Sequence, residues 1–168
     1  MPDGTRAVID GTHGLLRLSP DESYASEVRE RIARRAAKRE AERSAAFTLA
    51  RTRDGHRVEV VANIRNAAEA REAVAAGAEG VGLLRSEFLF DARDSAPSED
   101  EQAEAYLAVA EALGKERRFV VRTLDVGGDK PLSYLPLPEE KNPFLGLRGI
   151  RVSLEWPELF RAQLRAIL

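Results

Sequence analysis

The hydrophobic positions near the start of the chain follow a short strand pattern. Ala7–Ile9 and Leu15–Leu18 are apolar runs, and residues 10–14 between them read Asp-Gly-Thr-His-Gly, a run of turn formers. This pattern predicts a β-hairpin. Since two short strands bury too little apolar surface to fold alone, we expect the hairpin to be the end of a larger domain whose beginning precedes this chain.

A long helical pattern comes next, and it is mostly polar. Ser19 is a good helix cap, Pro20 suits the first helical position, and Glu22 completes a capping box. From there to about residue 50 the chain contains no Gly or Pro. Apolar residues recur at four-residue spacing at Tyr24, Val28 and Ile32. Arg, Lys, Glu and Ala fill most other positions, which is typical of a solvated connecting helix. The alternative, functional interpretation is a hinge between domains.

From Arg57 onward, strand and helix patterns alternate. The predicted strands are Val58–Ile64, Gly80–Ser86 and Phe119–Leu124. The predicted helices are Ala67–Ala76, Ser98–Leu113 and Pro157–Leu168. Gly77 and Gly114 follow two of these helices, and Ser98 with Glu101 forms a second capping box. This βαβαβα order predicts an α/β fold with a parallel sheet.

Composition and charge exclude several classes of function. The 168 residues carry a formal net charge of -2, so no global basic field attracts nucleic acid. The chain has no Cys, which excludes disulfides, thiolate metal sites and a cysteine nucleophile within it. No apolar run reaches the roughly 18 residues of a membrane span, and the polar first residues are unlike a signal peptide. We therefore expect a cytoplasmic protein.

Two strand ends carry candidate anion-binding groups. Arg85 lies near the end of the second predicted strand, and Arg122 lies among the apolar residues of the third. A buried arginine is costly unless it has an anionic partner, and a guanidinium group binds phosphate or carboxylate oxygens in bidentate fashion. Neighbouring parallel strands would bring both arginines to one pocket. The alternative is internal pairing, for example with Glu87 or Asp125, and the pattern alone leaves both interpretations open.

The other candidates for chemistry are weaker. Residues 127–130, Gly-Gly-Asp-Lys, would let backbone amides and a lysine approach an anion, although a glycine pair after a strand is usually only a turn. His13 lies in the hairpin turn and His56 stands beside Gly55, so we expect neither to be catalytic. No cluster of His and acidic residues has the spacing of metal ligands.

Four segments resemble the signatures of Enzyme I, the phosphoenolpyruvate-dependent protein phosphotransferase of bacterial sugar uptake. In chain order they are 77–90 (GAEGVGLLRSEFLF), 122–130 (RTLDVGGDK), 142–151 (NPFLGLRGIR) and 163–168 (QLRAIL). The resemblance extends from about Val8 to the last residue. Four long motifs in the family's order are far more specific than any one of them.

This resemblance implies a fold and a reaction. Enzyme I takes the phosphoryl group of phosphoenolpyruvate onto a histidine and passes it to the small histidine phosphocarrier protein. Its carboxy-terminal half is a (β/α)8 TIM barrel that binds phosphoenolpyruvate and Mg²⁺ and forms a homodimer, and such barrels place their sites at the C-terminal ends of the strands. By this resemblance, Arg85 and Arg122 bind the substrate phosphate, and Lys130, Asn142 and Arg148 line or support the site.

The same resemblance implies that much of the machinery lies outside this chain. The family's phosphorylated histidine segment would precede residue 1, and neither His13 nor His56 matches it. The Mg²⁺ ligands, a third substrate arginine and the catalytic cysteine would follow Leu168. We therefore expect no catalytic residue and no metal ligand here, and an isolated chain that is inactive. Ser86 keeps the hydroxyl of the family's usual Thr, whereas Lys141 reverses the charge of its usual Glu.

The expected organisation has three parts. Residues 1–20 would end a phosphohistidine domain, 21–56 would form a linker helix, and 57–168 would form the first three βα units of the barrel. A relative of pyruvate phosphate dikinase or phosphoenolpyruvate synthase is the alternative among enzymes, because these share the barrel, but the wording of 122–130 favours Enzyme I. A non-catalytic interaction fragment that pairs with intact Enzyme I is the alternative from another class. We expect neither nucleic acid nor a membrane as a partner.

Overall fold

The structure of this chain is a computed structural model, which describes residues 3–127, 132–138, 141–142 and 144–168. The chain divides into two compact units, Met1–Ala46 and Phe47–Leu168. Within the described ranges, no helix is long and apolar enough to cross a membrane.

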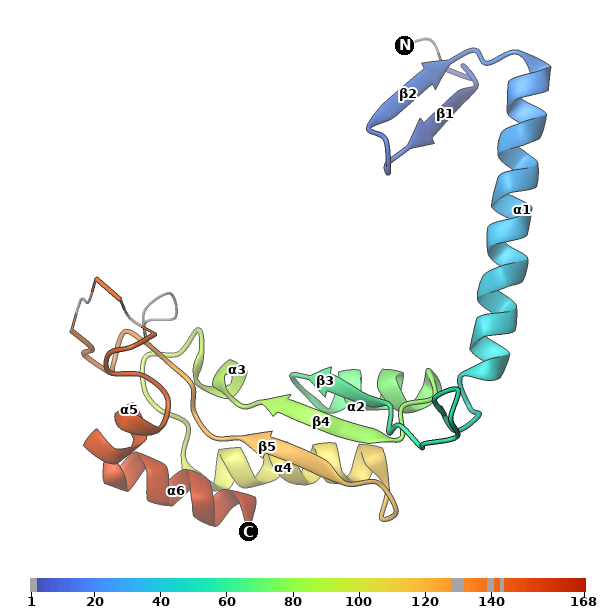
Figure 1. Ribbon diagram of the computed structural model, residues 1–168. Coiled ribbons are helices and arrows are strands. Elements are labelled where there is room, and N and C mark those ends of the chain that lie inside the picture. Colours follow the sequence, from blue (N-terminus) through green and yellow to red (C-terminus); the bar gives the residue numbers. More distant parts are fainter. Residues whose placement is uncertain (1–2, 128–131, 139–140, 143) are drawn as a thin grey trace. The chain divides into compact units, whose positions relative to one another are not determined.

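The first unit begins with the predicted hairpin. β1 (Ala7–Asp10) pairs with β2 (Leu15–Leu18) in antiparallel register (Figure 1). The Asp10 carboxylate accepts hydrogen bonds from the backbone N–H groups of Thr12 and His13, at 3.0 and 3.3 Å, and so closes the turn. The hairpin prediction is confirmed, with the first strand one residue longer than expected.

The long helix α1 (Glu22–Ala45) follows, and its cap differs from the predicted one. Asp21 is the N-cap, and its side chain accepts a hydrogen bond from the Tyr24 backbone N–H at 2.8 Å. The prediction of a Ser19 cap was wrong. Ser19 has a φ of +45°, and its backbone N–H donates to the Arg6 carbonyl at 2.8 Å. Ser19 therefore belongs to the end of the hairpin and not to the helix.

Helix α1 ends earlier than predicted, and the first strand of the sheet begins later. In the second unit, the Val58 N–H donates to the Ala50 carbonyl at 3.0 Å, and an antiparallel bridge joins Arg51 to Arg57. The backbone groups around residue 50 are thus paired with residues 57 and 58. This pairing takes the residues around 50 out of the helix and residue 58 out of the parallel sheet.

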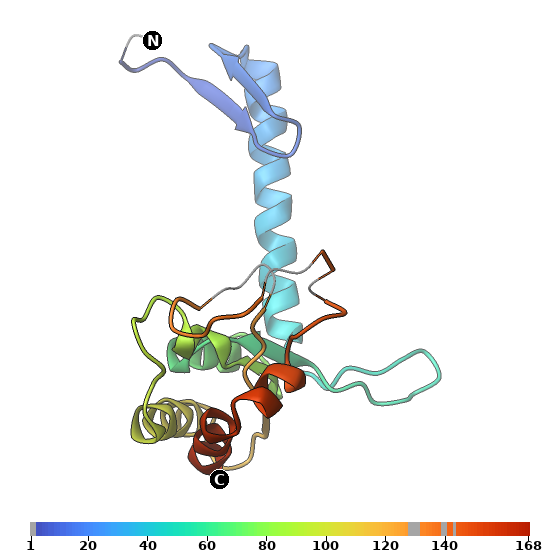
Figure 2. The same cartoon turned by 90° about the vertical axis from the view of Figure 1, so that its left-hand side faces the viewer.

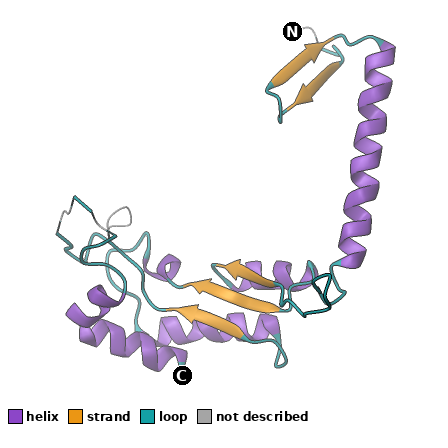
Figure 3. Cartoon of the chain, in the orientation of Figure 1, coloured by secondary structure: helices purple, strands orange, loops and turns teal. Residues whose placement is uncertain are grey.

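Three parallel strands form the sheet of the second unit (Figure 3). They are β3 (Val61–Ile64), β4 (Gly80–Arg85) and β5 (Phe119–Arg122). Their order is β3-β4-β5, so each strand lies beside the next one along the chain. The predicted parallel sheet, with the second strand in the middle, is confirmed.

Five helices accompany the sheet in the described part of the second unit. They are α2 (Ala67–Ala75), α3 (Glu87–Phe90), α4 (Glu99–Leu113), α5 (Ile150–Glu155) and α6 (Pro157–Ile167). The short α3 and α5 were not predicted, because one or two turns carry too little periodicity to detect. Figure 2 shows α4 and α6 side by side, and α4 also contacts α2. The predicted capping box is present at the start of α4, between Ser98 and Glu101.

The helices cover one face of the sheet. Ile64, Val81 and Leu84 are at most 2% exposed and belong to the same apolar cluster as the buried residues of α4. Successive strand residues point to opposite faces. Val61 and Val120 are 38% and 49% exposed, so the described helices leave the other face open. In the described structure the sheet is therefore packed against helices on one face, where its buried residues lie.

A second apolar cluster lies beyond the C-terminal ends of the strands. Its buried members are Phe90, Leu124, Val126, Leu132, Leu135 and Val152. They come from α3, from the segments after β5, and from α5. The Tyr134 hydroxyl adds a hydrogen bond to the Phe90 carbonyl at 2.7 Å. These contacts pack the described loop residues together at the strand ends.

Candidate functional site

Arg85 and Arg122 are the last residues of β4 and β5, and they are partners in the parallel register. Side chains paired in this way project to the same face of the sheet. Arg85 directly follows Leu84, whose side chain is buried against the helices, so Arg85 belongs to the open face. The structure brings the two predicted arginines to neighbouring positions at one edge of the sheet.

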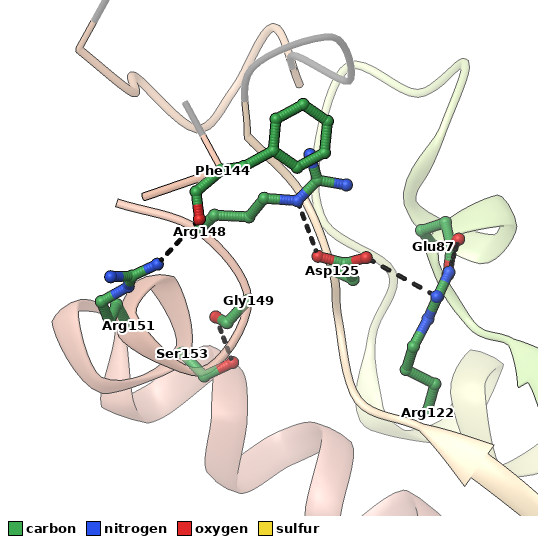
Figure 4. A network of polar contacts seen from close by, with 8 residues as sticks. All are labelled: Glu87, Arg122, Asp125, Phe144, Arg148, Gly149, Arg151 and Ser153. Atoms are coloured by element: carbon green, nitrogen blue, oxygen red, sulfur yellow. Dashed lines mark hydrogen bonds and ion pairs between the residues drawn. The ribbon is translucent and has the colours of Figure 1, made fainter. Parts of the chain in front are cut away.

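Arg122 is held by two carboxylates (Figure 4). Its guanidinium donates to Glu87 Oε1, and its Nη1 lies 3.6 Å from Asp125 Oδ2. The Glu87 side chain is only 7% exposed and that of Arg122 is 32% exposed. An ion pair that is partly withdrawn from water is screened less than a surface pair. The internal pairing considered for the arginines is therefore confirmed for Arg122.

Arg148 extends this arrangement by one more charge. Its Nε donates to Asp125 Oδ1 at 3.1 Å, and its guanidinium lies over the Phe144 ring, 4.4 Å from the ring centroid. The order Glu87, Arg122, Asp125, Arg148 alternates negative and positive charge, and we call these four residues the charge row. The contacts with Glu87 and Asp125 hold the Arg122 side chain in place. Because the formal charges of the row cancel, these neighbours also balance much of the charge of Arg122.

Arg85 has no comparable partner. Among the residues that the structure describes, its guanidinium forms neither a hydrogen bond nor an ion pair. The pKa of Glu69 is lowered mainly by the hydrogen bond from Arg65, and the charge of Arg85 contributes least to that shift. Arg85 therefore presents a positive charge and free donors beside the neutral charge row.

Two glycines lie in the loops beside the charge row. Gly127 has a φ of +126°, and a Cβ there would lie 2.9 Å from the Leu147 carbonyl oxygen. Gly149 has a φ of +57°, and a Cβ there would lie 3.7 Å from Asp125 Oδ1. Both backbone conformations favour glycine. Of the two, only Gly127 thus marks a loop approach too close for a side chain, whereas at Gly149 a Cβ would make an ordinary contact and the positive φ alone favours glycine.

Of the three predicted supporting residues, Arg148 joins the row. Asn142 is exposed, and its side chain makes no hydrogen bond to any described residue. Lys130 lies outside the described residues. Arg151, which was not predicted, donates to the Phe144 carbonyl at 3.2 Å and so steadies the residue whose ring contacts Arg148 (Figure 4).

Sequence reasoning also missed Gln163 of α6. This residue is 1% exposed, and its side chain forms hydrogen bonds at the ends of both β4 and β5. The available signal was a polar residue on the apolar stripe of the helix, between Phe160 and Ile167. A buried polar group at such a position needs partners, and here the partners lie at the strand ends.

The described residues by themselves do not fit a Mg²⁺ site. No group of three or more His, Cys, Asp or Glu side chains that could hold a metal ion occurs among them. Glu87 and Asp125, the two carboxylates of the charge row, are both engaged by arginines. Mg²⁺ requires oxygen ligands in near-octahedral geometry, and this part of the chain does not assemble them.

Comparison with known proteins places the chain in a family. Residues 38–168 match the family described as "PEP-utilising enzyme, PEP-binding domain", where PEP is phosphoenolpyruvate. The chain is 51% identical to the multiphosphoryl transfer protein of Rhodobacter capsulatus over 164 residues. This alignment covers 98% of this chain and 20% of the relative. It is 47% identical to the phosphoenolpyruvate-protein phosphotransferase of Staphylococcus carnosus over 165 residues, 98% of this chain and 29% of the relative. It is also 47% identical to the enzyme of the same name from Streptomyces coelicolor over 168 residues, 99% of this chain and 29% of the relative.

The chain is thus much shorter than these relatives, since it spans 20–29% of their length. The relatives are named as transferases, so the family is enzymatic. The family match includes every strand of the parallel sheet and the whole charge row. Because this match covers most of the chain, the protein belongs to the PEP-utilising enzymes, through their PEP-binding domain.

Proposed function

We propose that this chain contributes part of the phosphoenolpyruvate site of a phosphoenolpyruvate-protein phosphotransferase, Enzyme I of the bacterial sugar phosphotransferase system. The observation that carries the proposal is the register pairing of Arg85 with Arg122 on the open face of the sheet. Phosphoenolpyruvate carries a phosphate and a carboxylate, and guanidinium groups bind both. The names of the relatives favour this function over that of a dikinase or synthase.

In this proposal the two arginines have different roles. Arg85 attracts the phosphate with a guanidinium that forms no ion pair with a described carboxylate. Arg122 offers donors whose direction is set beforehand by Glu87 and Asp125. Its buried Nε has no hydrogen-bond partner among the described residues. Phosphoryl transfer depends on positioning and on neutralising oxygen charge, so one attracting and one orienting arginine suit the reaction.

The proposal also assigns the chain a place in a larger protein. The sheet and its helices form the first three βα units of a (β/α)8 barrel, with the arginines at the C-terminal ends of its strands. Residues 1–20 end a phosphohistidine domain, and 21–56 form the linker. The whole protein is cytoplasmic, dimerises through the barrel, binds Mg²⁺ with residues of its other parts, and passes the phosphoryl group from its own histidine to the histidine phosphocarrier protein. The 168-residue chain alone binds the substrate without turning it over.

Titration of the chain with phosphoenolpyruvate, followed by NMR, tests the proposal. We expect shifts at the backbone amides of Arg85 and Arg122 with a Kd of roughly a millimolar, because a few charge-assisted bonds of roughly 1.5–3 kcal/mol each are offset by the entropy of binding. Added salt should weaken the binding. Pyruvate, which lacks the phosphate, should produce much smaller shifts.

A matched pair of variants makes this test specific. Arg85→Ala should abolish the shifts. Arg118→Ala removes an arginine that directly precedes β5, at the end away from Arg122, where it pairs with Glu59, and should leave the shifts unchanged. Shifts confined to other regions, or shifts that survive Arg85→Ala, would contradict the proposal.

A further inference from the structure

We propose that Gln163 is a positioning residue that sets the spacing of Arg85 and Arg122. The inference rests on the proposed function, because the spacing matters only if both arginines bind one anion. The Gln163 side chain forms no hydrogen bond with either guanidinium group in the described structure. It acts instead through the Ser86 side chain and the Leu124 backbone, which lie next to the two arginines along the chain.

The Gln163 amide joins the ends of β4 and β5. Its Nε2 donates to Ser86 Oγ at 3.1 Å, and its Oε1 accepts from the Leu124 backbone N–H at 2.8 Å. Ser86 directly follows Arg85, and Leu124 lies two residues after Arg122. The parallel pairing of the two strands ends at the Arg85–Arg122 pair. The glutamine amide therefore makes the next link between the strand ends, in place of a backbone group.

The orientation of this amide is set by its neighbours. The Leu124 N–H can only donate, so it must face Oε1, which turns Nε2 toward Ser86. Nε2 also donates to the Tyr106 hydroxyl oxygen at 3.1 Å, and the Tyr106 hydroxyl donates to Gln102 Oε1 at 3.4 Å. Burial raises the pKa of Tyr106, which keeps the hydroxyl protonated as a donor. The Leu124 N–H is therefore enough to fix the direction of the amide, and the Tyr106 hydroxyl is a second acceptor for Nε2.

Loss of this link would act on both strand ends at once. Without the amide, the Leu124 N–H would lose its partner and the buried Ser86 hydroxyl would lose one of its partners, and burial makes unpaired polar groups unfavourable. The strand ends would then shift to find other partners. Anion binding requires donors placed to within ~0.5 Å, so such a shift weakens binding although both arginines remain.

Two buried glutamines provide the test and its matched control. Gln163→Met and Gln102→Met each remove a buried amide that bonds to Tyr106, and each preserves side-chain length. Both variants should lower the midpoint of chemical unfolding. Only Gln163→Met should weaken phosphoenolpyruvate binding, by about fivefold, the effect of losing one ordinary hydrogen bond. Ser86→Ala removes one of the two Nε2 acceptors and keeps the bond to the Leu124 N–H, so it should disturb folding less and weaken binding by about two- to threefold.

A readout without ligand separates this inference from the proposed function. In the free protein, Gln163→Met should speed hydrogen exchange at the Leu124 amide and shift the amide signals of Arg85 and Arg122, whereas Gln102→Met should do neither. If these changes appear but the unsubstituted chain does not bind phosphoenolpyruvate, the proposed function fails and the positioning role stands. If Gln163→Met and Ser86→Ala leave the arginine signals and the affinity unchanged, or Gln102→Met alters them equally, Gln163 serves stability alone and the inference is wrong.

Discussion

Arg85 and Arg122 are register partners at the ends of adjacent parallel strands, but only Arg122 is paired with carboxylates. The same side chain at equivalent strand positions therefore has two different environments. Around Arg122 the charges are balanced by direct ion pairs, whereas Arg85 forms no ion pair with a described residue. This asymmetry predicts that the two arginines contribute differently to stability.

Arg122→Ala should lower the free energy of unfolding by about 1–3 kcal/mol, because it leaves the buried Glu87 carboxylate without this partner. Arg85→Ala should change it by no more than about 0.5 kcal/mol, as is usual for a side chain outside a network. Chemical denaturation at pH 7 measures both. In the double variant Arg122→Ala/Glu87→Gln, the loss should be smaller than the sum of the single losses. Equal losses for the two arginine variants would contradict this assignment.

Asp125 lies between two arginines, so its charge matters more than that of an exposed carboxylate. Asp125→Asn should lower the free energy of unfolding by about 1–2 kcal/mol, since it weakens the contacts to both Arg122 and Arg148. Asp94→Asn is the control, because Asp94 is exposed and forms no ion pair within the described residues. It should be nearly neutral in the same denaturation experiment. A neutral Asp125→Asn would mean that the charge row contributes nothing to folding.

The strand and helix order was predictable because each element carries its own local signal. The alternation of apolar residues gave β3, β4 and β5, and the Ser98–Glu101 capping box gave the start of α4. The start of α1 was predicted with the wrong cap. Ser19 and Asp21 are both good cap residues, and the choice was made by pairing within the hairpin, which local sequence does not reveal.

The site was predictable only in part. Strand ends could be located from the sequence, so the proximity of Arg85 and Arg122 followed from the parallel order. Side-chain geometry after the strand ends decides the rest. It pairs Arg122 with Glu87 and Asp125 and leaves Arg85 without an ion pair to any described residue. The pattern therefore left both interpretations open. Internal pairing is confirmed for Arg122, and anion binding by Arg85 stays a prediction.

Gly127 should tolerate no side chain. A Cβ at this position would lie 2.9 Å from the Leu147 carbonyl oxygen, and the φ of +126° is strained for any other residue. Gly127→Ala should therefore lower the free energy of unfolding by about 1–3 kcal/mol, measured by chemical denaturation. Gly11→Ala is the matched control, because nothing lies within 4 Å of a Cβ there and its φ is unexceptional. A loss at Gly11 as large as that at Gly127 would contradict the close approach of the two loops.

Stability should fall in acid partly through Glu101. The hydrogen bond from Arg93, followed by that from the Ser98 backbone N–H, lowers the pKa of Glu101 from its ordinary value of 4.5 to about 2. Because the folded state holds this carboxylate in its charged form, its contribution is complete above the ordinary pKa and is lost as the pH falls from about 5 toward 2. Glu101→Gln should therefore flatten the decline in unfolding midpoint over this window, while lowering the midpoint at pH 7. Glu104→Gln, on the same helix, is the control: Glu104 is exposed and makes no hydrogen bond or ion pair with any described residue, so the decline should keep its slope. An unchanged acid slope in Glu101→Gln would show that the capping box does not respond to pH.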